Sequence, residues 1–523
     1  MSTDTVINHT LVQTLVSGHV LTSLPVSIRL VETHISWVLL TGQYAYKIKK
    51  PVRFGFLDFS SLEKRHFYCT EEIRLNRRLA PNIYLDVVPI TGTPAHPAVG
   101  GNGTAIEYAV KMTQFTDGQL LSERAENGLL SVEEIDQIAV LLAEFHEIVE
   151  RAGSDSLYGD ALDIKHWFDE NFDQIAPLLE DERDQQQLEK IRRWGESEWT
   201  NKSELMQFRK QQGYVRECHG DLHLSNITLV DGKVTLFDCI EFNPALRWID
   251  LISEVAFLMI DLFYYGYDRH AFRFLNRYLQ VTGDYRSLDV IHYYLVYRAL
   301  VLAKVSLLRR QQQCHGNDKQ EAQKRFQTFM SLAERFTRKN QAVMMITHGY
   351  SGSGKSFYAE RCAETIGAIH IRSDAERKRL FGYQLSDATD SEIGGGIYTQ
   401  DANVKTYRHL ADAADSILHA GFSVITDATF LKTWQRDIFR QAAHALALPF
   451  YILDLNAADE TRESRIRQRI NDASEATVDV MREQQQSAQP LSQAELACTI
   501  TIYTERDSAF DTWLASLVDC NVG

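Results

Sequence analysis

The pattern of hydrophobic and polar positions divides the chain into a β-rich beginning, a helical middle and an alternating end. Residues 35–49 predict two strands around a Thr-Gly-Gln turn, and residues 106–115 predict another strand, because apolar and β-branched residues recur there in short runs. The stretch 60–80 between them has the composition of a helix. The first part of the chain is therefore expected to combine a small sheet with helical structure.

From about residue 131 the pattern becomes mostly helical. It contains one hairpin at 227–237, in which an Asp-Gly pair between two alternating runs predicts a tight two-residue turn. The apolar segment 251–267 is interrupted by Glu254 and Asp261, which favours a core helix over a membrane span. A long helix over 293–310 closes this region.

Beyond the polar, charged stretch 311–340, short apolar runs alternate with helical stretches. Such alternation is typical of a parallel, doubly wound sheet. The predicted strands are 344–347, 368–373, 423–428 and 450–455. The expected organisation is a first domain over 1–310, a charged helical linker over 311–340 and a second domain over 341–523.

The composition is that of an ordinary soluble protein, with 44% hydrophobic and 24% charged residues over 523 positions. The formal net charge of −15 argues against general binding to nucleic acid or to a membrane surface, because both need a basic protein surface. Seven cysteines without a CxxC pair are typical of a reducing cytoplasm. The first residues lack a basic start followed by an apolar run, so no secretory signal is expected. We expect a cytoplasmic protein.

The second domain begins with a phosphate-binding signature. Residues 349–356 read Gly-Tyr-Ser-Gly-Ser-Gly-Lys-Ser and fit the G-x-x-x-x-G-K-[ST] (Walker A) pattern, between a predicted strand and a predicted helix. The glycines let backbone N–H groups turn toward phosphate oxygens, and the following helix N-terminus adds its dipole. The lysine reaches the phosphates and the last serine ligates Mg²⁺. The candidate nucleotide-binding residues are Gly349, Ser351, Gly352, Ser353, Gly354, Lys355 and Ser356.

This domain resembles the small P-loop kinases of metabolites and polynucleotide ends, such as gluconate, zeta-type and polynucleotide 5′-kinases. In Ser-Asp-x-x-Arg at 373–377, the resemblance implies that Asp374 accepts the proton of the substrate hydroxyl and that Arg377 steadies the substrate or the transferred phosphate. Asp427 is expected at the carboxyl end of a strand, where open α/β sheets bind ligands. The arginine-bearing segment 461–469 resembles the lid that covers ATP, and the sequence selects no single arginine in it.

The first domain carries a different signature. Residues 219–226 read His-Gly-Asp-Leu-His-Leu-Ser-Asn, and Asp238 follows the predicted hairpin. This arrangement resembles the catalytic loop of the aminoglycoside phosphotransferase and choline kinase families, relatives of the protein kinases. The resemblance implies that Asp221 faces the acceptor hydroxyl, while Asn226 and Asp238 face a magnesium ion.

These families also pair a lysine with a glutamate near the ATP phosphates, and the sequence offers two candidates for each residue. Lys47 and Lys49 are two residues apart and share one strand face, so the pattern cannot choose between them. Lys47 is preferred, with Lys49 as the alternate. The expected partner on the helix is Glu72, with Glu71 as the alternate.

Together the two signatures resemble bacterial fusion proteins that join an aminoglycoside phosphotransferase-like domain to a P-loop kinase. The expected fold class is α/β and α+β: a protein-kinase-like bilobal domain, followed by a doubly wound P-loop NTPase domain. The expected function is ATP- and Mg²⁺-dependent transfer of the γ-phosphoryl group to a hydroxyl of a small molecule that the sequence does not identify. Two alternatives remain open: a nucleotide-binding sensor in which one domain gates the other, and a polynucleotide 5′-end kinase.

Overall fold

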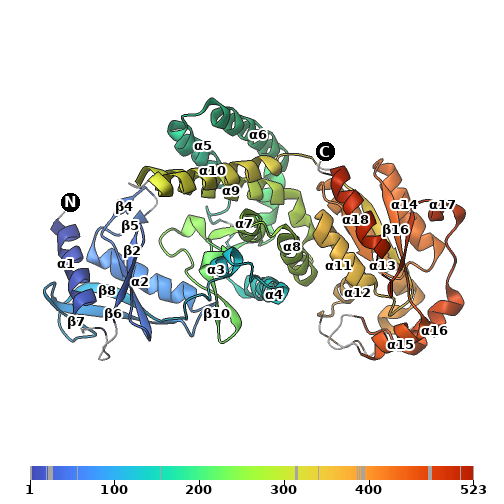
Figure 1. Cartoon of the computed structure of the whole chain (residues 1–523), viewed down its shortest axis with the longest axis horizontal. Coiled ribbons are helices and arrows are strands. Elements are labelled where there is room, and N and C mark those ends of the chain that lie inside the picture. The colour runs from blue at the N-terminus through green and yellow to red at the C-terminus, as the bar shows by residue number, and fades with distance from the viewer. Residues whose placement is uncertain are drawn as a thin grey trace. The chain divides into compact units, whose positions relative to one another are not determined.

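The computed structural model describes residues 3–18, 21, 27–55, 57–153, 155–312, 316–339, 341–385, 387, 389, 395–468, 474–506 and 508–521. Figure 1 shows the course of the chain. Its contacts divide it into two compact units. The first comprises residues 1–134, 144–167 and 203–261, and the second comprises residues 135–143, 168–202 and 262–523.

The first unit contains a six-stranded antiparallel sheet in the order β1-β2-β3-β8-β6-β7. Helix α1 (Thr3–Ser17) covers one face through Leu11 and Leu15, and helix α2 (Leu62–Asn76) covers the other through Cys69 and Ile73. Successive residues of a central strand, such as Ala45 and Tyr46, are both buried, as a sheet covered on both faces requires. The strands are β1 (Arg29–Glu32), β2 (Ser36–Leu40), β3 (Tyr44–Lys49), β6 (Tyr84–Thr93), β7 (His96–Val99) and β8 (Ala105–Thr113).

The rest of the first unit is built around the predicted hairpin, which is present as β10 (Ile227–Val230) and β11 (Lys233–Leu236). Asp231 and Gly232 both have positive φ, as the two-residue turn requires. The apolar run that begins at residue 251 forms helix α7 (Leu251–Tyr264), whose apolar side chains are buried. The remaining elements are β4 (Arg53–Phe54), β5 (Leu57–Asp58), α3 (Leu121–Glu126), β9 (Val215–Glu217), η2 (Leu224–Asn226), η3 (Pro244–Leu246) and β12 (Trp248–Asp250).

Four helices contribute residues to both units: α4 (Val132–Ile148), α5 (Ala161–Ile175), α6 (Glu182–Gln211) and, through its last turn, α7. The helices that follow α7 belong to the second unit. They are α8 (Asp268–Thr282), η4 (Tyr285–Ser287), α9 (Leu288–Gln312) and α10 (Gly316–Arg335), with the short η1 (Ala176–Leu178) before α6. Within the predicted linker 311–340, helix α10 packs along α9.

One helix of the second unit is both long and apolar. Residues Tyr285–Gln311 are long and apolar enough to cross a membrane, but 72% of their apolar window is buried inside the protein. A core helix of a soluble protein has the same properties.

The second unit also contains the predicted parallel sheet, in the order β14-β15-β13-β16-β17. In the sheet, β13 lies between β15 and β16, so the connection from β13 to β14 runs toward one edge and the connection from β15 to β16 runs toward the other. Open α/β sheets bind ligands beside such a reversal, at the carboxyl ends of the strands. The sequence prediction missed β17, an edge strand. The strands are β13 (Met344–His348), β14 (Ile369–Arg372), β15 (Val424–Asp427), β16 (Phe450–Asn456) and β17 (Thr499–Tyr503).

Helices flank this sheet (Figure 1), and the apolar core between them includes Met345, Leu453 and Phe510. They are α11 (Lys355–Ile366), α12 (Ser373–Leu380), η5 (Gly396–Tyr398), α13 (Gln400–His419), α14 (Thr433–Ala445), α15 (Asp459–Arg467), α16 (Val478–Ser487), α17 (Gln493–Leu496) and α18 (Ser508–Asn521). The described cysteines are free thiols: Cys69, Cys218, Cys239, Cys362 and Cys498.

Candidate active sites

The predicted phosphate loop connects β13 to α11, in the strand–loop–helix order that the motif requires. Gly349, Gly352 and Gly354 all have positive φ (142°, 82° and 94°), which L-residues rarely adopt. A Cβ on Gly349 would lie 2.6 Å from the Leu455 carbonyl oxygen, and one on Gly352 would lie 2.6 Å from that of Arg462. The loop is therefore compact enough that only glycine fits at these two positions.

The end of the loop meets the end of strand β15. The Ser356 hydroxyl donates to Asp427 Oδ2 at 2.6 Å, and Lys355 Nζ donates to the Tyr350 carbonyl at 2.8 Å. Burial by itself would raise the pKa of Asp427, but His370, Arg372 and Lys355 nearby hold it well below its usual range. Asp427 is thus a buried carboxylate beside the serine of the motif, and the two oxygens form a donor set suited to Mg²⁺.

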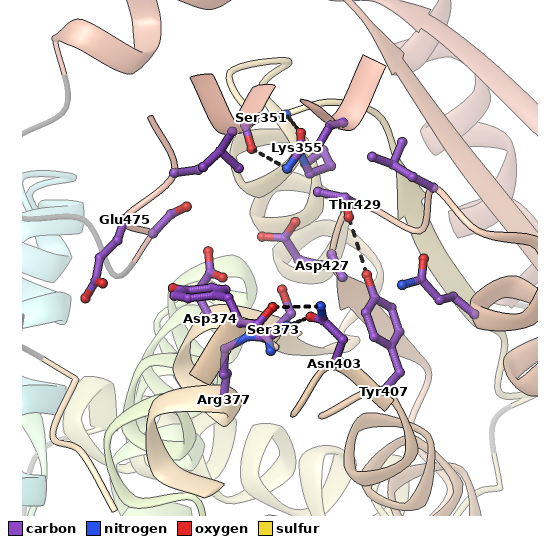
Figure 2. A pocket seen from close by; sticks show the side chains of 18 of the residues that line it. Ser351, Lys355, Ser373, Asp374, Arg377, Asn403, Tyr407, Asp427, Thr429 and Glu475 are labelled. Atoms are coloured by element: carbon purple, nitrogen blue, oxygen red, sulfur yellow. Dashed lines mark hydrogen bonds between the residues drawn. The ribbon is translucent and has the colours of Figure 1, made fainter. Parts of the chain in front are cut away.

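These residues line a cavity of about 340 Å³ together with residues of helix α12. Figure 2 shows Lys355, Asp427 and Asp374 around the same space, each from a different element. Asp374 lies in the first turn of α12. Arg377 lines the cavity as well, and its guanidinium donates to the Ile397 carbonyl and to Asn403 Oδ1, both at 2.8 Å. Arg377 thereby holds the 397–403 segment at the cavity.

The structure separates the arginines of the predicted lid. Arg465 Nη1 donates to Thr504 Oγ1 at 2.9 Å and lies 3.4 Å from the Gly352 carbonyl oxygen. The guanidinium of Arg462 lies 4.8 Å from the centre of the Tyr350 ring. Arg467 is 70% exposed and pairs with Glu463. The phosphate loop is therefore contacted by Arg462 and Arg465, whereas Arg467 forms its ion pair with Glu463, which lies outside the loop. Arg469 lies outside the described residues.

A second group of charged residues lies in the first unit, between β3, α2 and the end of the hairpin. Lys47 Nζ lies 2.9 Å from Glu72 Oε1 and 2.5 Å from Asp238 Oδ1. Lys49, on the same face of β3, is completely buried and contacts Glu72 Oε2 at 2.7 Å and Glu241. Glu72 thus binds both lysines, but Lys47 alone of the two contacts Asp238 in the described structure.

Of the two neighbouring glutamates on α2, Glu72 contacts these lysines and Glu71 does not pair with them. Glu72 is fully buried and faces the strand, whereas Glu71 pairs with Arg74 at 2.9 Å. Burial lowers the pKa of Lys47, but the carboxylates of Asp238 and Glu72 outweigh it and raise that pKa well above its usual value. Conversely, burial raises the pKa of Glu72, but Lys47 and Lys49 lower it to about 2. Lys47 and Glu72 are therefore both ionised at neutral pH.

The His-Gly-Asp loop brings Asp221, Asn226 and Asp238 into one neighbourhood. Asn226 Nδ2 donates to the Asp221 carbonyl at 2.9 Å and to its Oδ2 at 3.2 Å, which leaves the amide oxygen of Asn226 as the atom able to ligate a metal. Phe237 N donates to the Asn226 carbonyl at 3.0 Å, so the next residue, Asp238, is held beside Asn226. Asp238 has φ of +64°, an uncommon backbone conformation for aspartate.

Several residues that fix this loop had no role predicted from the sequence. Glu254 accepts from Gly220 N at 2.7 Å, and Asp261 accepts from Leu224 N at 2.7 Å. Both acids come from helix α7, where their interruption of an apolar run was the available signal. His219 Nε2 bonds the Phe237 carbonyl at 2.8 Å. Glu241, the buried partner of Lys49, had no comparable signal in the sequence.

The chain is similar to two known families of sequence. The model of the phosphotransferase enzyme family matches residues 63–290, and that of an AAA domain matches residues 344–491. Uncharacterized proteins of Mycobacterium tuberculosis and Mycobacterium bovis are 29% identical over 449 residues, which cover 86% of this chain and 88% of each relative.

Solved structures resemble one or the other part. A gluconokinase from Sinorhizobium meliloti is 20% identical, with a TM-score of 0.25, and the match covers 35% of this chain and 97% of that one. A choline kinase from Cryptosporidium parvum is 12% identical, with a TM-score of 0.39, over 64% of this chain and 96% of that one. The two family matches, in this order along the chain, show that it joins a kinase-like domain of the phosphotransferase enzyme family to a P-loop kinase-like domain of the AAA type.

Proposed function

We propose that the protein is an ATP-dependent kinase with two nucleotide sites, which transfers the γ-phosphoryl group to a hydroxyl of a small molecule. The observation that carries this proposal is the cavity of the second unit, where Lys355, Ser356, Asp427 and Asp374 converge from three elements. A phosphate clamp, metal ligands and a candidate base are the groups that phosphoryl transfer requires. The formal net charge of −15 favours a small acceptor over a nucleic acid.

In this centre the residues of the chain bind and orient the two substrates. The backbone N–H groups of 349–356 and Lys355 hold the β- and γ-phosphates, and Arg465 neutralises charge beside the loop. Ser356 and Asp427 would hold Mg²⁺, which supplies charge neutralisation on the phosphate oxygens when bound. The acceptor hydroxyl oxygen forms the new bond to the γ-phosphorus, the bond to the β–γ bridging oxygen breaks, and Asp374 takes the hydroxyl proton.

The first unit holds a second set of the same chemical groups. Lys47, fixed by Glu72, is the phosphate-binding cation, and Asp221 is the base. Asn226 and Asp238 would hold Mg²⁺, because both present oxygen ligands at the end of the hairpin. The contact of Lys47 with Asp238 supports this assignment, since it brings the phosphate-binding and metal-binding groups together.

The proposal is tested by ATP consumption of the full-length protein against a fractionated pool of cytoplasmic metabolites. Lys355→Ala removes the clamp of one centre and Asp221→Ala removes the base of the other. Lys405→Ala and Asp412→Ala, on the exposed face of α13, are the matched controls. We expect one fraction to stimulate ATP use, and at least one site variant to abolish it while the controls do not. If both sites bind nucleotide but no fraction stimulates ATP consumption, the result would instead favour the alternative of a nucleotide-binding sensor.

A further inference from the structure

Helix α8 covers the open edge of the parallel sheet, although it precedes the P-loop region by more than sixty residues of chain and lies within the phosphotransferase family match. Strand β14 is at the end of the sheet, so its outer N–H and C=O groups have no neighbouring strand. The buried side chain of Asn276 replaces that strand. Its Nδ2 donates to the Ala368 carbonyl at 2.9 Å, and its Oδ1 accepts from His370 N at 2.7 Å. One amide thus satisfies both backbone groups of the edge.

Strand β14, which Asn276 holds, lies beside Asp427, the proposed metal ligand of the P-loop centre. His370 Nε2 lies 3.6 Å from Asp427 Oδ2, the oxygen that accepts from the Ser356 hydroxyl. Two residues further along the same strand, Arg372 pairs in register with Asp427 and lines the cavity. A displacement of β14 would therefore move groups that surround Asp427.

A second contact holds helix α12, which carries Asp374 and Arg377. The hydroxyl of Tyr285, in the turn η4 after α8, donates to Glu376 Oε1 at 3.1 Å. Glu376 is 1% exposed and also pairs with Arg379 and, at 3.1 Å, with His409. Arg379 in turn donates to the Gln280 carbonyl of α8 at 2.6 Å. The helix with the candidate base is thereby tied to residues of the phosphotransferase region.

Two glycines show how closely these segments approach each other. A Cβ on Gly367, just before β14, would lie 2.7 Å from the Phe272 ring of α8. A Cβ on Gly283, just after α8, would lie 2.5 Å from Arg379 Nε. Arg273 of α8 adds an ion pair with Glu364 of α11 at 2.7 Å. The packing is therefore continuous from α11 to α12.

We propose that Asn276 and Tyr285 are positioning residues of the P-loop phosphotransfer centre, so that this centre is completed by α8 and η4 of the phosphotransferase-family region. This inference rests on the proposed function. The phosphate loop itself takes its close neighbours from Leu455, Arg462 and Gln484. Asn276 and Tyr285 therefore act on the acceptor and metal side of the cavity and leave ATP binding to the loop.

The test uses full-length protein in which Asp238→Ala silences the other centre. Asn276→Ala and Tyr285→Phe are compared with Tyr293→Phe, a matched control whose buried hydroxyl has no hydrogen-bond partner among the described residues. Hydrogen exchange is measured for peptides covering 369–380 and, as a reference, 450–456. Hydrolysis of Mg-ATP, with water as the acceptor, is measured with and without Lys355→Ala. The difference between the two rates is the turnover of the P-loop centre.

We expect both variants to speed exchange in 369–380 but not in 450–456, and to lower kcat about tenfold or more with the KM for ATP unchanged, because small displacements of reacting groups are costly. The control should change neither quantity. Unchanged exchange, or faster exchange with wild-type kcat, would show that these contacts do not position the centre. If neither water nor any metabolite fraction supports ATP turnover that depends on Lys355 in the Asp238→Ala protein, the proposed function fails at this centre, and the positioning role fails with it.

Discussion

The two lysines of β3 give the sharpest test of the first centre, because the structure predicts opposite consequences for them. Replacing Lys49 with Met leaves Glu241, which is 4% exposed, without its cation, while Glu72 keeps Lys47. Leaving one buried charge unpaired costs about 3–5 kcal/mol. At about 2–4 °C per kcal/mol for a unit of this size, the melting temperature of Lys49→Met should fall by roughly 6–20 °C.

Lys47→Met should behave differently. Glu72 keeps Lys49 at 2.7 Å, and Asp238, with a side chain that is 39% exposed, can be hydrated. The stability cost is therefore about 1 kcal/mol, as for a pair open to water. Turnover should instead fall by about 10²–10³-fold, because the cation beside Asp238, the proposed metal ligand, is lost.

Both variants are made in a Lys355→Ala background, so that only the first centre contributes to Mg-ATP hydrolysis. Thermal unfolding is followed by circular dichroism, and hydrolysis is measured at a temperature where both variants are folded. The reasoning would be refuted if Lys49→Met kept the wild-type melting temperature and lost hydrolysis while Lys47→Met kept hydrolysis. Lys49 would then be the phosphate-binding lysine.

Three further predictions concern the second unit. Gly352→Ala should abolish ATP binding to the phosphate loop, measured with a fluorescent nucleotide, because its Cβ would meet the Arg462 carbonyl. Gly421→Ala, with a similar φ of +88° but no described atom within 4 Å of its Cβ, should bind normally. Asp427→Asn should raise the Mg²⁺ concentration for half-maximal, Lys355-dependent hydrolysis about tenfold or more, since the neutral amide attracts the cation less; an unchanged Mg²⁺ titration would exclude Asp427 as a ligand. Burial raises the pKa of Glu495, but Arg436 outweighs it and lowers that pKa to about 2. This pair should therefore stabilise the protein above about pH 4.3 and lose its effect as the pH falls toward 2, so Glu495→Gln should flatten the dependence of melting temperature on pH over that range.

Local patterns predicted the elements that carry the chemistry. The buried runs of β13 to β16 were recognisable because strands covered on both faces are continuously apolar, and the glycine spacing of 349–356 placed the phosphate loop. Strand β6 was not assigned, and it contains Pro89, which removes a backbone donor. Periodicity put Lys47 and Lys49 on one face, but their distances from Asp238 depend on where the hairpin returns, almost two hundred residues later.

The contacts that surround each centre depend on such long-range packing. Nothing near Asn276 or Tyr285 in the sequence indicates a role for a strand and a helix about ninety residues away. The acids of α7 were visible as interruptions of an apolar run, yet their partners on the His-Gly-Asp loop follow only from the fold. Motifs point to the candidate reacting groups, and the tertiary structure shows which residues hold them in place.

The division of the chain into units has a consequence for how such a protein can be inherited or rebuilt. The second unit draws on residues 135–143 and 168–202 as well as on everything after 261, so no single cut in the chain separates the two units. A junction in the stretch 311–340 would leave β14 with an uncovered edge in one fragment and α8 with an exposed face in the other. A recombinant joined at that point would fold well only if the α8 of one parent fitted the parallel sheet of the other. This requirement favours inheritance of the two kinase-like regions together.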